Sequence, residues 1–243
     1  MRLLLLTCIL TLSTFIGKAQ VDFFEGSWQE AAVQAKLEKK FLFVDCYTDW
    51  CYWCKVSDRT TFQSKEVSDF LNKNFISVKV DMEKGDGIYL GMKYRVSSYP
   101  TFLVFDSTGQ VLNSISGYQK DDSKFIDELK SVVKGKNRYR YISSIHNQIK
   151  FPAFYTASFG DADNEKKELV SEQLQVTKWL QSQEDITAEV AWNVISRFDL
   201  DEKNQERFLA ELEVFRKLYG NREVNDKVVG IAANMLAPIL EKK

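Results

Sequence analysis

The chain has 243 residues, of which 44% are hydrophobic and 28% are charged. This balance is typical of a globular protein that buries a core without a disulfide scaffold, and the length favours two small domains. The formal net charge is −1, with 33 basic and 34 acidic residues, and the sequence has no basic run. Because phosphate binding needs clustered lysine and arginine, nucleic acid is excluded as an expected partner.

Residues 1–19 have the features of a secretory signal peptide. Arg2 precedes an apolar run over residues 3–16, and the small residues Gly17 and Ala19 stand before a cleavage site after Ala19. The run is shorter than the roughly 20 apolar residues of a membrane-spanning helix, although an uncleaved anchor is the alternative. We therefore predict an exported, periplasmic protein, from which Cys8 is removed with the peptide.

Helices and strands are predicted to follow one another from residue 28 to residue 133. Hydrophobic spacing and turn residues place strands at residues 41–44, 75–81, 101–105 and 111–115. Helices are expected at residues 28–40, at 56–71 with a kink at Thr60 and Thr61, at 88–94, and from Asp121 or Asp122 to 133. A βαβ crossover followed by a ββα unit predicts an α/β fold, in which helices cover both faces of one mixed sheet.

The sequence changes character beyond residue 136. Helical patterns occupy residues 163–181, 187–198, 202–219 and 224–240, and Gly220-Asn221 is a natural stop between the last two. We therefore predict a first domain over residues 20–136 that folds on its own, followed by a small all-helical domain over residues 137–243.

Cys51 and Cys54 are predicted at a junction between a strand and a helix. There they can close a small disulfide ring, and the amide groups of the helix favour a thiolate at the first cysteine. We predict that Cys51 is the exposed nucleophile and that the more buried Cys54 resolves the mixed disulfide. A zinc site is the main alternative, but it normally needs four ligands, and the only histidine is the distant His146. No metal or other cofactor is expected.

The residues around this pair resemble the thioredoxin superfamily. The resemblance rests on Val44-Asp45, on Trp50-Cys51-Tyr52-Trp53-Cys54-Lys55, on Tyr99-Pro100-Thr101-Phe102 at the start of a strand, and on Gly117 after the last strand. Residues 49–51, 61–67 and 78–81 are most similar to the C-terminal domain of the periplasmic transmembrane disulfide reductase and to its free-standing exported relatives. The resemblance covers residues 20–136 and says nothing about residues 137–243.

The resemblance implies roles for particular residues. Asp45 would be a buried carboxylate with a raised pKa that handles the proton of Cys54, whereas the alternative is an exposed aspartate at a strand end. Pro100 would follow a cis bond and place the backbone of Tyr99 beside Cys51, where it pairs with an incoming peptide. Trp50 would form an apolar platform beside the cysteines, with plain core packing as the alternative.

Several positions depart from the family pattern. Tyr52-Trp53 replaces the familiar Gly-Pro pair and widens the apolar surface for protein partners, and no histidine adjoins Cys54. Thioredoxins place a lysine near the buried aspartate at the position of Ser77, and Lys79 should point to the same side of that strand. Cys46 should face the opposite side from Asp45 as a buried thiol.

These features predict an exported thiol–disulfide oxidoreductase that acts on protein disulfides through Cys51 and Cys54, more as a reductase than as an oxidase. Its expected partners are protein thiols and disulfides and an upstream electron donor, for which a membrane disulfide reductase is a candidate. The alternative is a protein-binding or chaperone-like module with incidental redox activity. The combination of Cys51, Cys54, Asp45 and Pro100 favours the enzyme, because a binding module need not keep these residues together. Oligomeric state is left open.

Overall fold

The structure is a computed structural model that describes residues 19–136, 143–159 and 169–240. Residues 1–18 of the predicted signal peptide lie outside these ranges. The predicted domain junction at residue 137 and the first six residues of the helix predicted from residue 163 also lie outside them.

Four strands form one sheet in the order β2-β1-β3-β4. β1 (Phe41–Tyr47) pairs in parallel with β2 (Phe75–Asp81) and antiparallel with β3 (Thr101–Phe105), which pairs antiparallel with β4 (Val111–Ser116). The predicted mixed sheet is therefore confirmed. β1 extends beyond the predicted residues 41–44, so that Asp45 and Cys46 lie within the strand.

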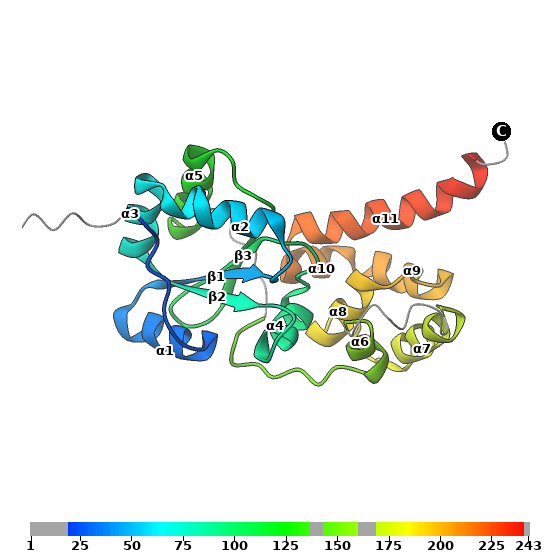
Figure 1. Cartoon of the computed structure of the whole chain (residues 1–243). Coiled ribbons are helices and arrows are strands. Elements are labelled where there is room, and N and C mark those ends of the chain that lie inside the picture. Colours follow the sequence, from blue (N-terminus) through cyan, green and yellow to red (C-terminus); the bar gives the residue numbers. More distant parts are fainter. Residues whose placement is uncertain (1–18, 137–142, 160–168, 241–243) are drawn as a thin grey trace, which may run out of the picture.

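Helices cover both faces of the sheet (Figure 1). On one side lie α1 (Trp28–Glu38) and α4 (Asp86–Tyr94), and on the other lie α2 (Tyr52–Arg59), α3 (Lys65–Asn74) and α5 (Asp122–Val133). A short 3₁₀ turn, η1 (Thr61–Gln63), separates α2 from α3 at the predicted kink. The carboxylate of Asp121 accepts a hydrogen bond from the backbone amide of Lys124 at 3.1 Å, which caps α5 as one of the two predicted alternatives.

Alternating side chains of β1 enter two different apolar layers. Phe43 points toward α3 and α5. Its ring lies 5.4 Å from that of Phe102 on the neighbouring strand β3 and 6.3 Å from that of Phe125 on α5. Val44 and Cys46 join the layer on the other side of the sheet. Cys46 is a free, fully buried thiol there, as predicted.

The part of the chain after residue 136, which we call the tail, is helical over most of the residues that the structure describes, as predicted. Its helices are α6 (Ala153–Ala157), α7 (Leu169–Ser182), α8 (Glu189–Arg197), α9 (Glu202–Ala210), α10 (Leu212–Tyr219) and α11 (Asn221–Leu240). The short α6 was not predicted from the sequence, whereas the predicted stop at Gly220 does end α10. Within the described ranges, no helix combines the length and the apolar character needed to cross a membrane.

The single helix predicted over residues 202–219 is wrong, because it divides at Glu211 into α9 and α10. Phe208 and Phe215 would lie about 10 Å apart along a straight helix. Their rings are instead 5.0 Å apart, and both rings contact that of Trp192. The division of the helix therefore allows two phenylalanines to cover one buried tryptophan.

The tail packs against the end of α4 and lies beyond the strand ends toward which the arrows of β1 and β2 point (Figure 1). Arg95, which follows α4, donates hydrogen bonds to Asn193 of α8 at 2.7 Å and to Glu223 of α11 at 2.6 Å. The hydroxyl of Tyr155 donates to the carbonyl of Met92 at 2.8 Å. One apolar cluster thus contains residues of the sheet and residues of the tail.

We expect residues 20–136 to unfold cooperatively when produced alone, because they contain the whole sheet and the helices on both of its faces. The fragment should melt about 5 °C or more below the full chain, since it loses the apolar and polar contacts made by the tail at α4. Thermal melts of the fragment and of the full chain, followed by circular dichroism, show whether the transition is cooperative and give the two melting temperatures. A fragment without a cooperative transition would show that the tail completes the core.

Candidate functional site

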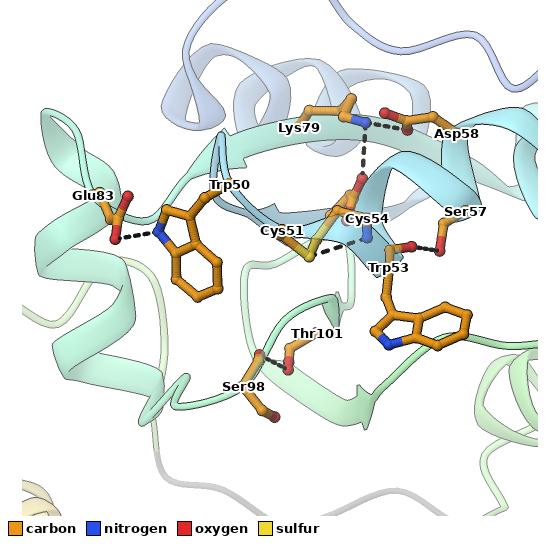
Figure 2. The surroundings of a disulfide bond; sticks show 11 residues. Trp50, Cys51, Trp53, Cys54, Ser57, Asp58, Lys79, Glu83, Ser98 and Thr101 are labelled. Carbon is orange, nitrogen blue, oxygen red and sulfur yellow. Dashed lines mark hydrogen bonds and ion pairs between the residues drawn. A yellow bond between two sulfur atoms is a disulfide. The ribbon is translucent and has the colours of Figure 1, made fainter.

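A disulfide joins Cys51 and Cys54 at the start of α2 (Figure 2). Cys51 is the N-cap of this helix, and its sulfur accepts a hydrogen bond from the backbone amide of Cys54 at 3.0 Å. The amide of Cys51 donates to the carbonyl of Thr48 at 3.1 Å, which holds the preceding loop. The predicted strand-to-helix junction is confirmed, and the helix amides there favour an anionic sulfur once the disulfide is reduced.

The two sulfurs do not differ in exposure as expected. Cys51 is 3% exposed and Cys54 is 2% exposed. The expectation of an exposed Cys51 is wrong for the disulfide form, because its sulfur turns inward onto the amide and the sulfur of Cys54.

Asp45 lies on β1 and is fully buried. Burial raises the pKa of its carboxyl to about 6. The positive charge of Lys79 lowers this pKa, and the negative charge of Asp58 raises it, but both effects are smaller than that of burial. The predicted buried aspartate with a raised pKa is therefore present, and the alternative of an exposed strand end is wrong.

Lys79 connects this buried carboxylate to the protein surface. It lies opposite Asp45 in the β1–β2 register, with 3.2 Å between its Nζ and Oδ2 of Asp45. The same Nζ forms an ion pair with Asp58 of α2 (Figure 2). Lys79 therefore reaches the side of its strand that the sequence predicted, and its charge favours the ionised form of Asp45.

The sequence reasoning missed Asp58. It follows Cys54 by four residues on α2, so both side chains lie along the same side of the helix. This four-residue spacing is the feature of the sequence that could have identified Asp58 as a site residue. The side chain of Asp58 is 44% exposed, so the series of charged groups from Asp45 through Lys79 to Asp58 runs from the interior to solvent.

Aromatic side chains surround the disulfide. Trp50, Tyr52 and Trp53 are 65%, 68% and 51% exposed. The ring of Trp50 lies 5.9 Å from that of Tyr99, and the ring of Trp53 stacks on that of Tyr118 at 5.3 Å. We call these five residues the aromatic rim. Core packing of Trp50 is excluded by its exposure, and Tyr118 is a member that the sequence reasoning missed.

The peptide bond between Tyr99 and Pro100 is cis, as the resemblance implied. The carbonyl of Pro100 accepts a hydrogen bond from the amide of Gly117 at 2.8 Å, and the hydroxyl of Thr101 donates to the carbonyl of Ser98 at 2.7 Å. Gly117 has φ +84°, a conformation that glycine adopts without a steric penalty. These contacts hold the loop that carries Tyr99, whose ring lies next to that of Trp50, the residue before Cys51.

A family model described as "Thioredox_DsbH: Protein of unknown function, DUF255" matches residues 15–134, which include every residue of this site. The first half of this chain belongs to the thioredoxin superfamily. It is related to the disulfide interchange protein DsbD and to DsbH-like proteins. Together with the Cys51–Cys54 pair, this places the thioredoxin-like part among disulfide oxidoreductase-like proteins.

Three similar proteins illustrate the relationship. Spermatogenesis-associated protein 20 of Rattus norvegicus is 37% identical over 81 residues, which are 32% of this chain and 10% of that protein. Thiol:disulfide interchange protein DsbD of Yersinia pestis (strain Pestoides F) is 30% identical over 106 residues, or 42% of this chain and 18% of that protein. A solved structure of a candidate disulphide-isomerase from Bacteroides thetaiotaomicron is 38% identical, with 48% of this chain and 96% of that chain covered and a TM-score of 0.44. The chain thus spans less than a fifth of either curated relative.

The thioredoxin-like site allows a direct test of the ion pair between Lys79 and Asp45. Lys79→Met should raise the pKa of Asp45 from about 6 to about 7 or above, because a nearby opposite charge lowers a carboxyl pKa by roughly one to three. The charge of Asp58 would remain in this variant, and it also raises the pKa of Asp45. An NMR titration of the Asp45 carboxyl carbon in the disulfide form measures the change.

Lys65→Met is the matched control, because Lys65 pairs with Asp69 on the exposed side of α3. This control should leave the pKa of Asp45 unchanged. An unchanged value in Lys79→Met as well would mean that burial alone determines the titration of Asp45.

Proposed function

We propose that this protein is an exported thiol–disulfide oxidoreductase that reduces disulfides of other proteins. The observation that carries the proposal is the position of the Cys51 sulfur at the N-terminus of α2, bonded to Cys54, after a strand that holds the fully buried carboxyl of Asp45 with a pKa of about 6. A sulfur in this position is acidic when reduced, and a carboxyl with this pKa exchanges protons near neutral pH.

The reaction starts from the dithiol form. The Cys51 thiolate attacks one sulfur of the partner's disulfide, and the other partner sulfur leaves as a thiolate and takes up a proton. The Cys54 thiol then loses its proton, attacks the Cys51 sulfur and releases the second partner sulfur, which is protonated in turn. The partner gains two electrons, and Cys51 and Cys54 become the disulfide. An external dithiol must restore the reduced form.

Asp45 serves this reaction as the acceptor of the Cys54 proton. With a pKa of about 6 it is mostly ionised at pH 7, so it can accept a proton as Cys54 attacks. Lys79 and Asp58 then offer a charged route along which the proton leaves toward solvent. Asp45 is therefore assigned to proton transfer, and Cys51 and Cys54 to the exchange of sulfur bonds.

The other site residues are assigned to the partner. Trp50, Tyr52 and Trp53 offer exposed apolar surface on the chain that carries the disulfide, and such surface suits protein docking. The backbone of Tyr99, ahead of Pro100, is assigned to pair with the extended partner segment that carries the target disulfide.

The charges in this region support a reductase rather than an oxidase. Strong oxidants stabilise their reduced form, and a neighbouring imidazolium is one way to do so. The only histidine of the sequence is His146, which lies in the tail next to the turn at Gly109. The buried carboxyl of Asp45 disfavours a second negative charge on the sulfurs. Both features favour a reductase.

Equilibration with glutathione redox buffers tests the proposal. The fraction of disulfide, measured by alkylation and mass spectrometry, gives the reduction potential. A value near about −270 mV is expected for a reductase, whereas a value near about −120 mV would mean an oxidase. If variants without either cysteine still bind and protect unfolded partners with unchanged efficiency, the chaperone-like module is the better description.

Trp53→Ala should raise the KM for a protein disulfide by roughly tenfold, because it removes the ring that stacks on Tyr118 at the edge of the disulfide. Reduction of a small aromatic disulfide reagent should change little, since such a reagent needs only the sulfur. Phe70→Ala, on α3, is the matched control for loss of an aromatic ring outside the aromatic rim. Equal losses on both substrates in Trp53→Ala would contradict a docking role.

Export is proposed from the basic start and the apolar run of residues 1–19, and a mature protein that begins at Gln20 would support it. The electron donor would then be a membrane disulfide reductase that works on the same side of the membrane. Its thiols would reduce the Cys51–Cys54 disulfide by the same exchange chemistry.

A further inference from the structure

A cavity of about 520 Å³ lies between the thioredoxin-like part and the tail, outside the disulfide site. Its volume is within the range of ligand pockets. Its walls come from the end of α4, from β4, and from α6, α8 and α11, with Ser97, Ser116, Arg197 and Lys227 among the lining residues. The cavity is therefore formed only where the tail packs on the sheet.

The cavity borders the loop that carries the cis peptide bond. Ser97 lines the cavity and is two residues from Tyr99, a distance of at most about 7 Å along the chain. On the other side of the loop, Ser116 lines the cavity and pairs with Thr101 in the β3–β4 register. The ring of Tyr99 contacts that of Trp50, which precedes Cys51. A partner segment beside Cys51 can therefore reach the cavity within a few residues.

The charged lining of the cavity is predominantly cationic. Four cationic side chains and two acidic side chains line it: Arg95, Arg197, Arg222, Lys227, Glu223 and Asp226. The ion pair between Arg95 and Glu223, at 2.6 Å, balances one charge of each sign. Among the other lining residues, the cations Arg197 and Lys227 outnumber the acidic Asp226.

Two of these cations make hydrogen bonds to neutral groups. Arg197 donates to the hydroxyl of Ser158 at 2.7 Å and to the carbonyl of the same residue, and Lys227 donates to the carbonyl of Phe198 at 2.6 Å. The neutral acceptors satisfy these donors, and the carboxylates that act on the two cations, Glu172 on Arg197 and Asp199 on Lys227, offset only part of the cost of burial. Burial accordingly lowers the pKa of both side chains. An anion in the cavity would recover part of this cost of burying the cations.

We infer that this cavity binds an acidic segment of the protein substrate, a few residues from the disulfide that is reduced. The inference rests on the proposed function and adds a substrate class to it, namely protein disulfides flanked by aspartate or glutamate. The hydroxyl groups of Ser97 and Ser116 supply further donors for carboxylate oxygens. The tail thereby acquires a role in specificity.

Two synthetic peptides test the inference. Each has the same length and one internal disulfide, flanked in one peptide by three glutamates and in the other by three glutamines. The full-length protein is reduced with dithiothreitol, freed of excess reagent and mixed with each peptide at low ionic strength. We expect the acidic peptide to react about tenfold faster, and this preference to fall as salt screens the charges.

Two variants should change the preference in opposite directions. Lys227→Gln removes a cation from the cavity and should lower the preference to about twofold, whereas Asp226→Asn removes an acidic group and should increase it. Lys203→Gln is the matched control, because Lys203 is an exposed lysine of α9 that does not line the cavity, and it should keep the preference of the wild type. Thermal melts show that each variant is folded.

The neutral peptide separates this inference from the proposed function. If both peptides are reduced at equal rates, the cavity assignment is overturned while the reductase stands. If neither peptide is reduced, the reductase proposal fails. The cavity assignment is then tested by fluorescence anisotropy, which measures binding of a cysteine-free acidic peptide to the disulfide form of the protein. Binding that weakens in Lys227→Gln supports the cavity assignment, and absence of binding overturns it.

Discussion

Cys51→Ser should abolish reduction of protein disulfides, with a loss on the order of a thousandfold or more, because a hydroxyl at this position cannot supply the attacking thiolate. The rate of substrate reduction with dithiothreitol as donor, compared with the rate without protein, measures the loss. Cys46→Ala is the matched control, since Cys46 is a free thiol buried on the opposite side of β1. If Cys46→Ala lost the activity and Cys51→Ser kept it, the assignment of the nucleophile would be wrong.

Cys54→Ser should instead trap partners. The first attack by Cys51 remains possible, but no second sulfur is present to release the mixed disulfide. Non-reducing gels should show adducts that disappear with dithiothreitol and are absent when both cysteines are replaced. Adducts formed by Cys51→Ser rather than by Cys54→Ser would reverse the two roles.

Asp45→Asn should slow turnover roughly tenfold to hundredfold at pH 7, because the amide cannot accept the proton of Cys54. In the wild type, the rate of mixed-disulfide resolution should rise as pH increases through about 6 and the carboxyl ionises. This rise should be absent from the variant. Stopped-flow measurements of resolution from pH 5 to pH 8 distinguish the two profiles. Identical profiles would leave Asp45 without a part in proton transfer.

The same substitution should change the pH dependence of stability. The pKa of Asp45 is about 6 in the folded protein and near the ordinary value of 3.8 in the unfolded chain, so the folded state opposes ionisation. The wild type therefore loses stability as pH rises from about 4 through about 6, by up to about 3 kcal/mol, and the loss is constant at higher pH. Asp45→Asn lacks this loss. The free energy of unfolding of the variant, relative to that of the wild type, should therefore increase from about pH 4 to about pH 6.

Chemical denaturation of the disulfide form at pH 4 and pH 8 measures this difference. Asp69→Asn is the control, because Asp69 is an exposed aspartate of α3 and its substitution should give the same small effect at both pH values. A difference between Asp45→Asn and wild type that stays constant from pH 4 to pH 8 would mean that the carboxyl titrates as in the unfolded chain.

The local features of the site could be predicted from the sequence because they depend on short-range rules. Strand alternation separated Asp45 from Cys46 and turned Lys79 toward the side of the buried carboxyl, and the structure bears out all three placements. The position of Cys51 at a helix start followed from the order of strand and helix. The cis bond before Pro100 followed from resemblance alone, since most bonds before proline are trans.

The features that were missed depend on contacts between elements distant in the sequence. Asp58 becomes part of the site only because β2 lies beside β1 and brings Lys79 under α2. Tyr118 joins the aromatic rim because the hairpin of β3 and β4 returns to the start of α2. The division at Glu211 contains neither glycine nor proline and follows from the packing of Phe208 and Phe215 on Trp192.

The sequence by itself determined the sheet with its covering helices, the redox pair and the buried aspartate, because periodicity and residue type decide which side chains leave water. Only the tertiary structure decided that the tail packs beside the loop of Tyr99 and that a cationic cavity lies between them. Helical periodicity shows which face of a helix is apolar, but it contains no information about the surface that the face covers. In this protein that surface adjoins the disulfide, so the arrangement of the tail around Arg95 determines which residues a partner meets after the redox pair.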